Sequence, residues 1–278
     1  MIAWRAGVVL ALFFAMTFPL MPLQLLLVRT GSRWARTFPH WYHKKVCRLL
    51  GIRINLDGMI ASGRPVLLIA NHVSWLDIPV LSAVAPLSFI AKQEVARWPF
   101  VGWLAKLQRS VFVDRDRRSA VASQATEIAE RLEAGETIVL FAEGTTGDGF
   151  KVLPFKSSLL GAALPTRLRP HRPDIAVQTL AICYPRICGL PIGRENMPLI
   201  AWYGDMDVPG HAWGVLKAGP VDAAVTIGPP LDYERIGNRK SVARYAEGEV
   251  RAAMRAAFRP SLQPASDRPS LDVGEAGG

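Results

Sequence analysis

The sequence predicts an α/β fold: a mainly parallel β-sheet flanked by helices, with an N-terminal hydrophobic membrane helix. Short apolar runs alternate with longer segments of helical periodicity, which favours an α/β domain. The run 65–70 is apolar at every position, as strands buried on both faces of a parallel sheet are. A third observation is the stretch 6–28, which carries no formal charge and predicts the extra helix.

The charge-free stretch 6–28 is long enough to cross a membrane. As a helix it would measure about 35 Å, and a bilayer core is about 30 Å thick. Pro19 and Pro22 lie within it, so a kinked or half-inserted helix is an alternative to a straight span. A signal peptide is a second alternative, although no small-x-small cleavage site follows. We predict a membrane anchor over residues 1–30.

Basic and aromatic residues follow the anchor. The basic residues include Arg29, Arg33, Arg36, Lys44, Lys45 and Arg48, and no acidic residue precedes Asp57. By the positive-inside rule, the body of the protein faces the cytoplasm, which predicts the inner (cytoplasmic) membrane. Interleaved aromatic residues suit contact with membrane lipids, although an ordinary basic helix packed on the domain has the same composition.

Composition excludes several classes of site. The net charge of +10 raises the question of nucleic acid, but no nucleic-acid-binding motif occurs and the basic cluster adjoins an apolar run. Cys47, Cys183 and Cys188 are odd in number and form no C-x2-C pair, which indicates a reducing compartment without disulfides. His40 and His43 lack nearby acidic or thiol partners, so we interpret them as interfacial or structural and predict no metal site.

The remaining elements occupy residues 31–258, which we predict to be one domain. Helices are predicted from periodicity over 32–50, 98–105, 116–134 and 239–258, with Gly135 as a C-cap. Short apolar runs predict strands over 52–56, 65–70, 88–91, 110–113, 137–141, 175–182 and 221–227. Residues 259–278 are rich in Pro, Ser, Asp and Gly and are predicted to be a disordered tail.

The turn after strand 65–70 holds the strongest candidate for chemistry, His72 five residues before Asp77. Imidazole moves protons near neutral pH, and a carboxylate on its second nitrogen fixes the tautomer. No nucleophilic serine or cysteine in a recognisable elbow accompanies the pair. It therefore predicts a base that activates a substrate hydroxyl. The structural alternative is a strand-end histidine that is merely hydrogen-bonded to a carboxylate.

Geometry restricts how this pair can meet. In one continuous helix, five residues rotate by about 140°, so the two side chains would diverge. They meet only if His72 lies in a turn and Asp77 in the first helical turn. Ser74 is a candidate N-cap with Asp77 three positions later, as in a capping box, and Pro79 suits an early helical position. The pair then lies at the carboxyl end of a strand, where open α/β sheets bind ligands.

Further polar groups follow other predicted strands and face the same edge. Lys92 and Arg115 are suited to an anionic headgroup. Glu143 is suited to substrate hydroxyls or an ammonium group, and Gly144 lets the backbone approach a ligand. Taken singly, each is better explained as a solvated residue at a strand end.

Together these segments resemble the glycerolipid acyltransferases, the 1-acylglycerol-3-phosphate acyltransferase family. The family's N-H-x4-D motif is matched by Asn71, His72 and Asp77. Residues 112–115 resemble F-I-x-R, with Arg109 where a glycine is usual, and 141–146 resemble F-P-E-G-T-R. Residues 177–180 echo a fourth, V-P-V-like strand. The resemblance spans about residues 35 to 230.

Two departures point to a subgroup. Ala142 replaces the proline, and Thr146 replaces the arginine that in the family helps to bind the substrate phosphate. Segments 98–100, 106–113, 143–149 and 201–206 resemble the bacterial lyso-ornithine lipid O-acyltransferases, whose acceptor carries an amino-acid headgroup and no phosphate. Thr146 agrees with such an acceptor. Asp148 either meets the ornithine ammonium or is an ordinary turn aspartate.

The resemblance implies a membrane-bound acyltransferase that moves a fatty acyl chain from a thioester to the hydroxyl of a lysolipid. His72 would be the base and Asp77 its orienting partner. The expected acceptor-binding residues are Lys92, Arg115, Glu143, Gly144 and Thr145. The donor would be acyl carrier protein or acyl-CoA, with no metal or redox cofactor. Phosphatidic acid formation from 1-acyl-sn-glycerol-3-phosphate, alone or as a second activity, is one alternative, and a non-enzymatic lipid-binding scaffold is another.

Overall fold

The computed structural model describes residues 2–113, 118–163 and 175–259. Its strands form a sheet in the order β1-β8-β6-β2-β5-β3-β4, with β7 paired to β6. Neighbours are parallel except at β6, where β7 and β8 are antiparallel to it, so the predicted mainly parallel sheet is confirmed. The strands are β1 (Ile52–Asp57), β2 (Val66–Ala70), β3 (Ser88–Lys92), β4 (Val111–Val113), β5 (Thr137–Phe141), β6 (Ala176–Ile187), β7 (Leu190–Pro191) and β8 (Val221–Pro230).

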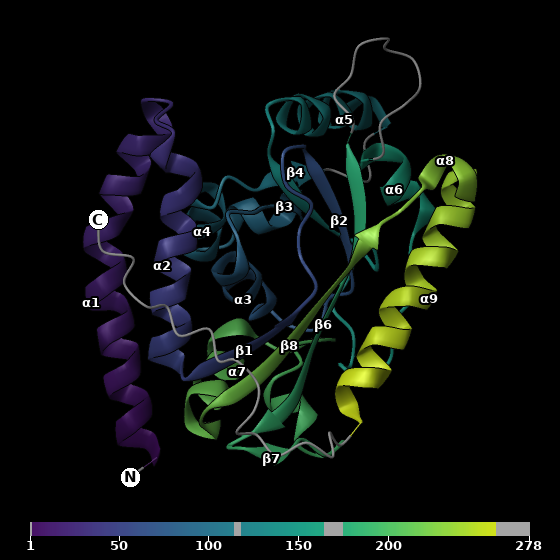
Figure 1. The fold of residues 1–278 in the computed structure, drawn as a ribbon. Coiled ribbons are helices and arrows are strands. Elements are labelled where there is room, and N and C mark those ends of the chain that lie inside the picture. Colours follow the sequence, from purple (N-terminus) through teal and green to yellow (C-terminus); the bar gives the residue numbers. More distant parts are fainter. Residues whose placement is uncertain (1, 114–117, 164–174, 260–278) are drawn as a thin grey trace, which may run out of the picture.

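Helices cover both faces of the sheet (Figure 1). They are α1 (Ile2–Arg29), α2 (Trp34–Leu50), α3 (Asp77–Val84), α4 (Val101–Leu107), α5 (Arg118–Glu133), α6 (Ser157–Ala163), α7 (Val208–Ala218), α8 (Tyr233–Ile236) and α9 (Arg239–Phe258), with 3₁₀ turns at Gln93–Arg97 and Met197–Leu199. The predicted elements are found within a few residues of their expected ends. The short helices α6, α7 and α8 were not predicted, because few turns of helix leave little periodicity to recognise.

Strand β6 is longer than its prediction, which ended at residue 182. Pro185 within this extension lacks the N–H that a regular ladder requires. The register between β6 and β8 shifts between Cys183 and Arg186, so that the strand passes the proline and pairs again at Arg186. The extension adds Tyr184, which is completely buried, to the sheet.

Strand β2 lies at the centre of the sheet and divides the core into two layers. All five of its residues have no exposed surface. Alternate side chains enter opposite layers, as the two-residue period of a strand requires: Leu68 joins the layer with α2, α3 and α7, and Leu67 joins the layer with α5, α6 and α9. The turn that follows β2 is therefore held by a fully packed strand.

Helix α1 is long and apolar enough over Ala3–Arg29 to cross a membrane, with a mean hydropathy of 2.0 in a window of which 11% is buried. It lies beside α2 (Figure 1, left). Its buried polar side chains face the domain: Thr17 Oγ1 lies 2.7 Å from Tyr42 OH, and Gln24 Nε2 donates to the carbonyls of Ala35 and Leu107. The side chains of Trp4, Leu12, Phe18 and Leu26 are exposed. This apolar helix is consistent with membrane association.

The assignment of residues 1–30 to an anchor and of 31–258 to one catalytic domain stays a prediction. The expected disordered tail lies almost wholly beyond the described residues, which end at Arg259.

Candidate active site

The predicted pair meets in the turn between β2 and α3. His72 Nδ1 lies 2.7 Å from Asp77 Oδ2, and Asp77 is the first residue of α3. This strand–turn–helix geometry is the one that the five-residue spacing required. The Asp77 side chain is completely buried and that of His72 is 20% exposed, so the imidazole reaches the surface while the carboxylate does not.

Four donors converge on the Asp77 carboxylate. Oδ2 accepts from the backbone N–H of Val73 at 2.7 Å and of Ser74 at 3.1 Å, in addition to His72. Oδ1 accepts from the Tyr184 hydroxyl at 2.7 Å. Burial, followed by the charge of Asp77, raises the pKa of Tyr184 well above its usual value, so this hydroxyl stays protonated and donates. Sequence reasoning missed Tyr184, whose only signal is a hydroxyl at the end of an apolar run.

The prediction that Ser74 caps α3 through its side chain is wrong. The residue before the helix is Leu76, which makes no side-chain cap, and the buried Ser74 hydroxyl has no hydrogen-bond partner among the described residues. Only the reverse half of the capping box forms, because the Asp77 carboxylate accepts from the Ser74 N–H. Three hydrogen bonds join the Asp77 carboxylate to residues 72–74 and hold these residues in a turn. The helix therefore begins later than the capping pattern predicts.

The His72 ring is fixed from a second side by Phe141. The two rings are stacked with centroids 3.9 Å apart and an interplanar angle of 12°. Phe141 ends β5 and is the register partner of Ala70, the last residue of β2, so the parallel ladder places the two rings at the same height. No hydrogen bond to His72 Nε2 occurs within the described residues. The ring therefore directs one nitrogen to Asp77, and the other has no hydrogen-bond partner in the described part of the chain.

The segment after β5 holds the backbone of His72. Gly144 adopts a φ of 72°, the left-handed conformation that glycine takes without strain, and turns the chain back. Glu143 Oε2 then accepts from the His72 N–H at 3.3 Å, and Oε1 accepts from the Leu153 N–H at 3.0 Å. The Gly147 N–H donates to the His72 carbonyl at 2.8 Å. The segment 141–146 therefore lies directly against the turn that contains His72.

Glu143 is buried and its environment disfavours a charge. Burial is the main cause that raises the pKa of Glu143 to about 8, against a partial opposing effect of its two backbone hydrogen bonds. Of the neighbouring candidates, Thr145 is exposed and Thr146 is half-buried. Both oxygens of Glu143 are engaged with the backbone, whereas Thr145 and Thr146 keep exposed surface.

Of the two cationic residues predicted to bind an anionic headgroup, the structure describes Lys92 and does not describe Arg115. Lys92 is exposed at the end of β3, which is separated from β2 by β5. Two strand spacings place it about 10 Å to the side of β2, at the same sheet edge as His72 but not in contact with it. Arg115 lies outside the described residues.

Other polar residues have structural partners. His40 Nδ1 lies 2.7 Å from the Ser82 carbonyl and His43 Nε2 lies 3.0 Å from Gln108 Oε1, and burial lowers the pKa of His43 to about 4. Asp148 Oδ1 accepts from the backbone N–H groups of Phe150 and Lys151, both at 2.9 Å. These are the hydrogen bonds of an ordinary turn aspartate. Asn71 ties β2 to β6 through two hydrogen bonds with the backbone of residue 182.

Segments 98–100 and 201–206 meet beside the turn that contains His72. The Trp202 N–H donates to the Val73 carbonyl at 3.0 Å, one residue from His72. The Trp202 ring packs edge-on against Trp98, with centroids 5.9 Å apart at 82°. These tryptophans thus form part of the wall near the turn.

A different arrangement occupies the amino edge of the sheet. Arg109 has a φ of 60°, a conformation that explains why a glycine is usual at this position in the resembled family. Its guanidinium pairs with the buried carboxylate of Glu136, which Arg36 and Arg131 also approach within 4 Å. The ion pair offsets the backbone strain that glycine would avoid.

Comparisons with known proteins identify the family. The family model described as Acyltransferase matches residues 52–182, which include the turn with His72 and Asp77. The lyso-ornithine lipid O-acyltransferase of Brucella abortus is 45% identical over 254 residues, 91% of this chain and 95% of that protein. The 1-acyl-sn-glycerol-3-phosphate acyltransferase of Neisseria meningitidis is 30% identical and covers 73% of this chain and 78% of its own.

A solved structure shares the fold. The crystal structure of the 1-acyl-sn-glycerophosphate acyltransferase from Thermotoga maritima matches with a TM-score of 0.66 at 21% identity, and the alignment covers 95% of this chain and 100% of that one. With the motifs, the relatives and the fold in agreement, this chain belongs to the glycerolipid acyltransferase family and is an O-acyltransferase.

Proposed function

We propose that this chain transfers a fatty acyl group from a thioester to the hydroxyl of lyso-ornithine lipid, giving ornithine lipid at the cytoplasmic membrane. The observation that carries the reaction type is the His72–Asp77 pair, whose outer nitrogen has no protein partner among the described residues. The acceptor is inferred from the relative in Brucella abortus and from Thr146, which leaves the position of the phosphate-binding arginine uncharged.

The reaction follows from this geometry in two steps. His72 Nε2 takes the proton of the acceptor hydroxyl as its oxygen attacks the thioester carbonyl, and Asp77 stabilises the imidazolium that forms. The tetrahedral intermediate then collapses: the C–S bond breaks, and the leaving thiolate receives the proton from His72. The ester and the free thiol account for every atom, so no acyl-enzyme, metal or redox cofactor is required.

The acceptor contacts are part of the proposal. Thr145 and the backbone at Gly144 bind the lysolipid beside His72, and Glu143 shapes this wall through its bonds to the backbone. Lys92, farther along the edge, binds anionic or carbonyl groups of the acceptor, and Arg115 is proposed for the same role. The ornithine headgroup presents both an ammonium and a carboxylate, so a site that combines hydroxyls with separate cations suits it.

The donor and the orientation complete the proposal. Acyl carrier protein or acyl-CoA supplies the thioester, and the excess of basic residues favours encounter with either anionic donor. Arg29, Arg33 and Arg36 follow the exposed apolar helix α1, which supports a catalytic domain on the cytoplasmic side of the inner membrane.

A second candidate acceptor is 1-acyl-sn-glycerol-3-phosphate, which is favoured by the relative from Neisseria meningitidis. Lyso-ornithine lipid and lysophosphatidic acid are to be offered in parallel to the purified protein with each donor, with measurement of thiol release and of the lipid product. We expect a higher kcat/KM for lyso-ornithine lipid. A strong preference for the phosphate acceptor overturns the assignment of lyso-ornithine lipid as the acceptor. If neither lipid causes thiol release, acyl transfer itself is overturned.

The Thr146→Arg variant sharpens this test. An arginine at this position supplies a fork for a phosphate dianion, so kcat/KM for lysophosphatidic acid should rise relative to that for lyso-ornithine lipid. Thr146→Gln, which lengthens the side chain without a charge, is the matched control.

A further inference from the structure

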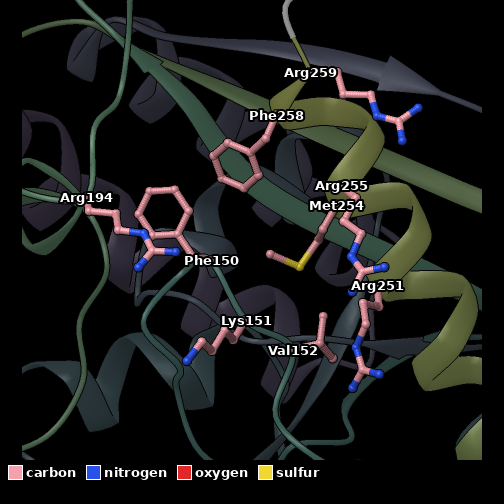
Figure 2. Close-up of a pocket in the computed structure, with 9 residues that line it drawn as sticks. All are labelled: Phe150, Lys151, Val152, Arg194, Arg251, Met254, Arg255, Phe258 and Arg259. Carbon is pink, nitrogen blue, oxygen red and sulfur yellow. The ribbon is translucent and has the colours of Figure 1, made fainter.

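A cationic groove opens between the segment that follows the Glu143 loop and the end of α9. Its volume is about 670 Å³, a size typical of small-molecule sites. Figure 2 shows Phe150 and Arg194 on one side, with Met254 and the arginines of α9 on the other. The basic side chains that line it are Lys151, Arg194, Arg251, Arg255 and Arg259.

Few of these charges are neutralised by the protein. Of the five basic side chains that line the groove, only Arg251 forms an ion pair with a described residue, Glu247. No carboxylate is among the residues that line the groove. Arg255 complements the negative end of the α9 dipole, which explains one of the cations. Lys151 and Arg194 come from other segments, so the helix dipole does not account for them. Like charges gathered around a hollow repel one another and favour an anion between them.

The apolar part of the groove is continuous with its charged rim. The rings of Phe150 and Phe258 lie 5.2 Å apart, and the Arg194 guanidinium lies over the Phe150 ring at 5.9 Å. Val152 and Met254 add aliphatic surface. A suitable ligand therefore combines phosphate-like negative charge with an extended, less polar portion.

The groove leads toward the catalytic turn. The Gly147 N–H donates to the His72 carbonyl, and the chain reaches the groove at Phe150, three residues later, a span of at most about 11 Å. A smaller hollow of about 160 Å³ shares Phe150, Lys151 and Arg194 with the groove and extends to Met197 and Tyr203. Asp148 also lines this hollow, and its carboxylate is hydrogen-bonded to the backbone N–H groups of residues 150 and 151. Gly149 packs against Met197 and Val73, the residue after His72.

The groove lies away from the exposed apolar helix. Helix α9 covers the layer of the core that also contains α5 and α6, whereas α1 packs against α2 and α7 on the other layer. Figure 1 shows α1 and α9 on opposite sides of the molecule. A ligand that enters at α9 thus arrives from water rather than from the surface that presents Trp4, Leu12 and Phe18.

We propose that this groove binds the phosphate-bearing pantetheine arm of the acyl donor. The inference rests on the proposed acyl transfer and assigns the donor side of the same site. Arg194 and Arg255 hold the phosphate with charge-assisted hydrogen bonds, and the aromatic floor supports the arm as it extends along the smaller hollow toward His72. Coenzyme A and a carrier protein both carry a phosphopantetheine group, so its phosphate is the chemistry common to both sources.

The test uses the full-length protein in detergent and the double variant Arg194→Ala/Arg255→Ala. Each lost charged hydrogen bond should raise the donor KM about tenfold, with kcat and the acceptor KM nearly unchanged. The salt dependence of kcat/KM for the donor should weaken as well. The matched control is Arg244→Ala, which removes an exposed arginine of α9 outside the groove and should leave the donor KM unchanged.

The outcomes separate this proposal from the proposed function. An active wild type whose donor KM is unchanged in the double variant overturns the groove assignment alone, as does a rise confined to the acceptor KM. A wild type without transferase activity overturns the proposed function instead. Coenzyme A and holo-carrier protein, offered separately as competitors, identify the source: competition by either that is lost in the double variant supports the proposal, and competition by neither overturns it.

Discussion

The buried carboxyl groups at the two edges of the sheet have different kinds of partner. At the amino edge, Glu136 is surrounded by three arginines, and Ser88 adds a hydrogen bond. At the carboxyl edge, Asp77 and Glu143 have no arginine or lysine ion pair within the described residues and are held by backbone N–H groups, Tyr184 and His72. The amino edge clamps segments together with paired charges. At the carboxyl edge, neutral donors and His72 hold the Asp77 carboxylate, and burial favours the neutral form of Glu143.

This contrast predicts that substitutions at the carboxyl edge change activity or the pH dependence of stability, whereas those at the amino edge change stability and leave activity unchanged. The His72→Ala variant has the largest expected effect. It removes the base, so kcat should fall by at least ~10²-fold. The thermal midpoint should stay close to that of the wild type, because His72 is not part of the packed core. Turnover within a few-fold of normal would show that another group takes the proton.

Glu143→Gln should alter the pH dependence of stability. The pKa of Glu143 lies near 8 in the folded protein, above its ordinary value of 4.5, so the folded state favours the neutral acid. The stabilisation is present below pH 4.5 and is lost as the pH rises through 8. Between pH 5 and 8 the wild type should therefore lose on the order of 2–4 kcal/mol relative to the variant. Unfolding midpoints of both proteins at the two pH values provide the measurement, and parallel behaviour would contradict the buried, uncompensated carboxyl.

Tyr184→Phe should have a smaller effect at the same edge. The substitution keeps the packing but removes one of four donors to Asp77, which should cost about 1–2 kcal/mol of stability. Because Asp77 holds the imidazole, kcat should fall several-fold while both KM values stay near normal. An altered acceptor KM with unchanged kcat would mean that Tyr184 acts on the substrate rather than through Asp77.

Substitutions of Arg109 should have the smallest effect and test the amino edge. Arg109→Ala keeps the strained φ of 60° and loses the ion pair with Glu136, whereas Arg109→Gly loses the pair but relieves the strain. The glycine variant should thus be the more stable by about 1 kcal/mol, the reverse of the usual order for these two residues. Both should retain normal kcat. A marked loss of activity in either would break the division between the two edges.

Sequence patterns predicted local features better than partnerships between distant segments. The strand–turn–helix at residues 65–84 was predictable because its hydrophobic run, its spacing and its helix start lie within twenty residues of one another. Tyr184 was missed because it meets Asp77 from 107 residues away and lies two residues past the predicted end of its strand at residue 182. The cationic groove was equally hidden, since Phe150, Arg194 and Arg255 form no pattern until β-sheet topology brings their segments together.

The stacking of His72 on Phe141 has a consequence for the entropy of the reaction. A histidine at the mouth of a site ordinarily rotates about two side-chain bonds, and that freedom must be lost before a proton can move. Here one ring face is covered by Phe141 and one nitrogen is bound by Asp77, so the direction of Nε2 is set when the chain folds. The substrate meets a base that has already given up its rotation, and only the hydroxyl must still be brought into line.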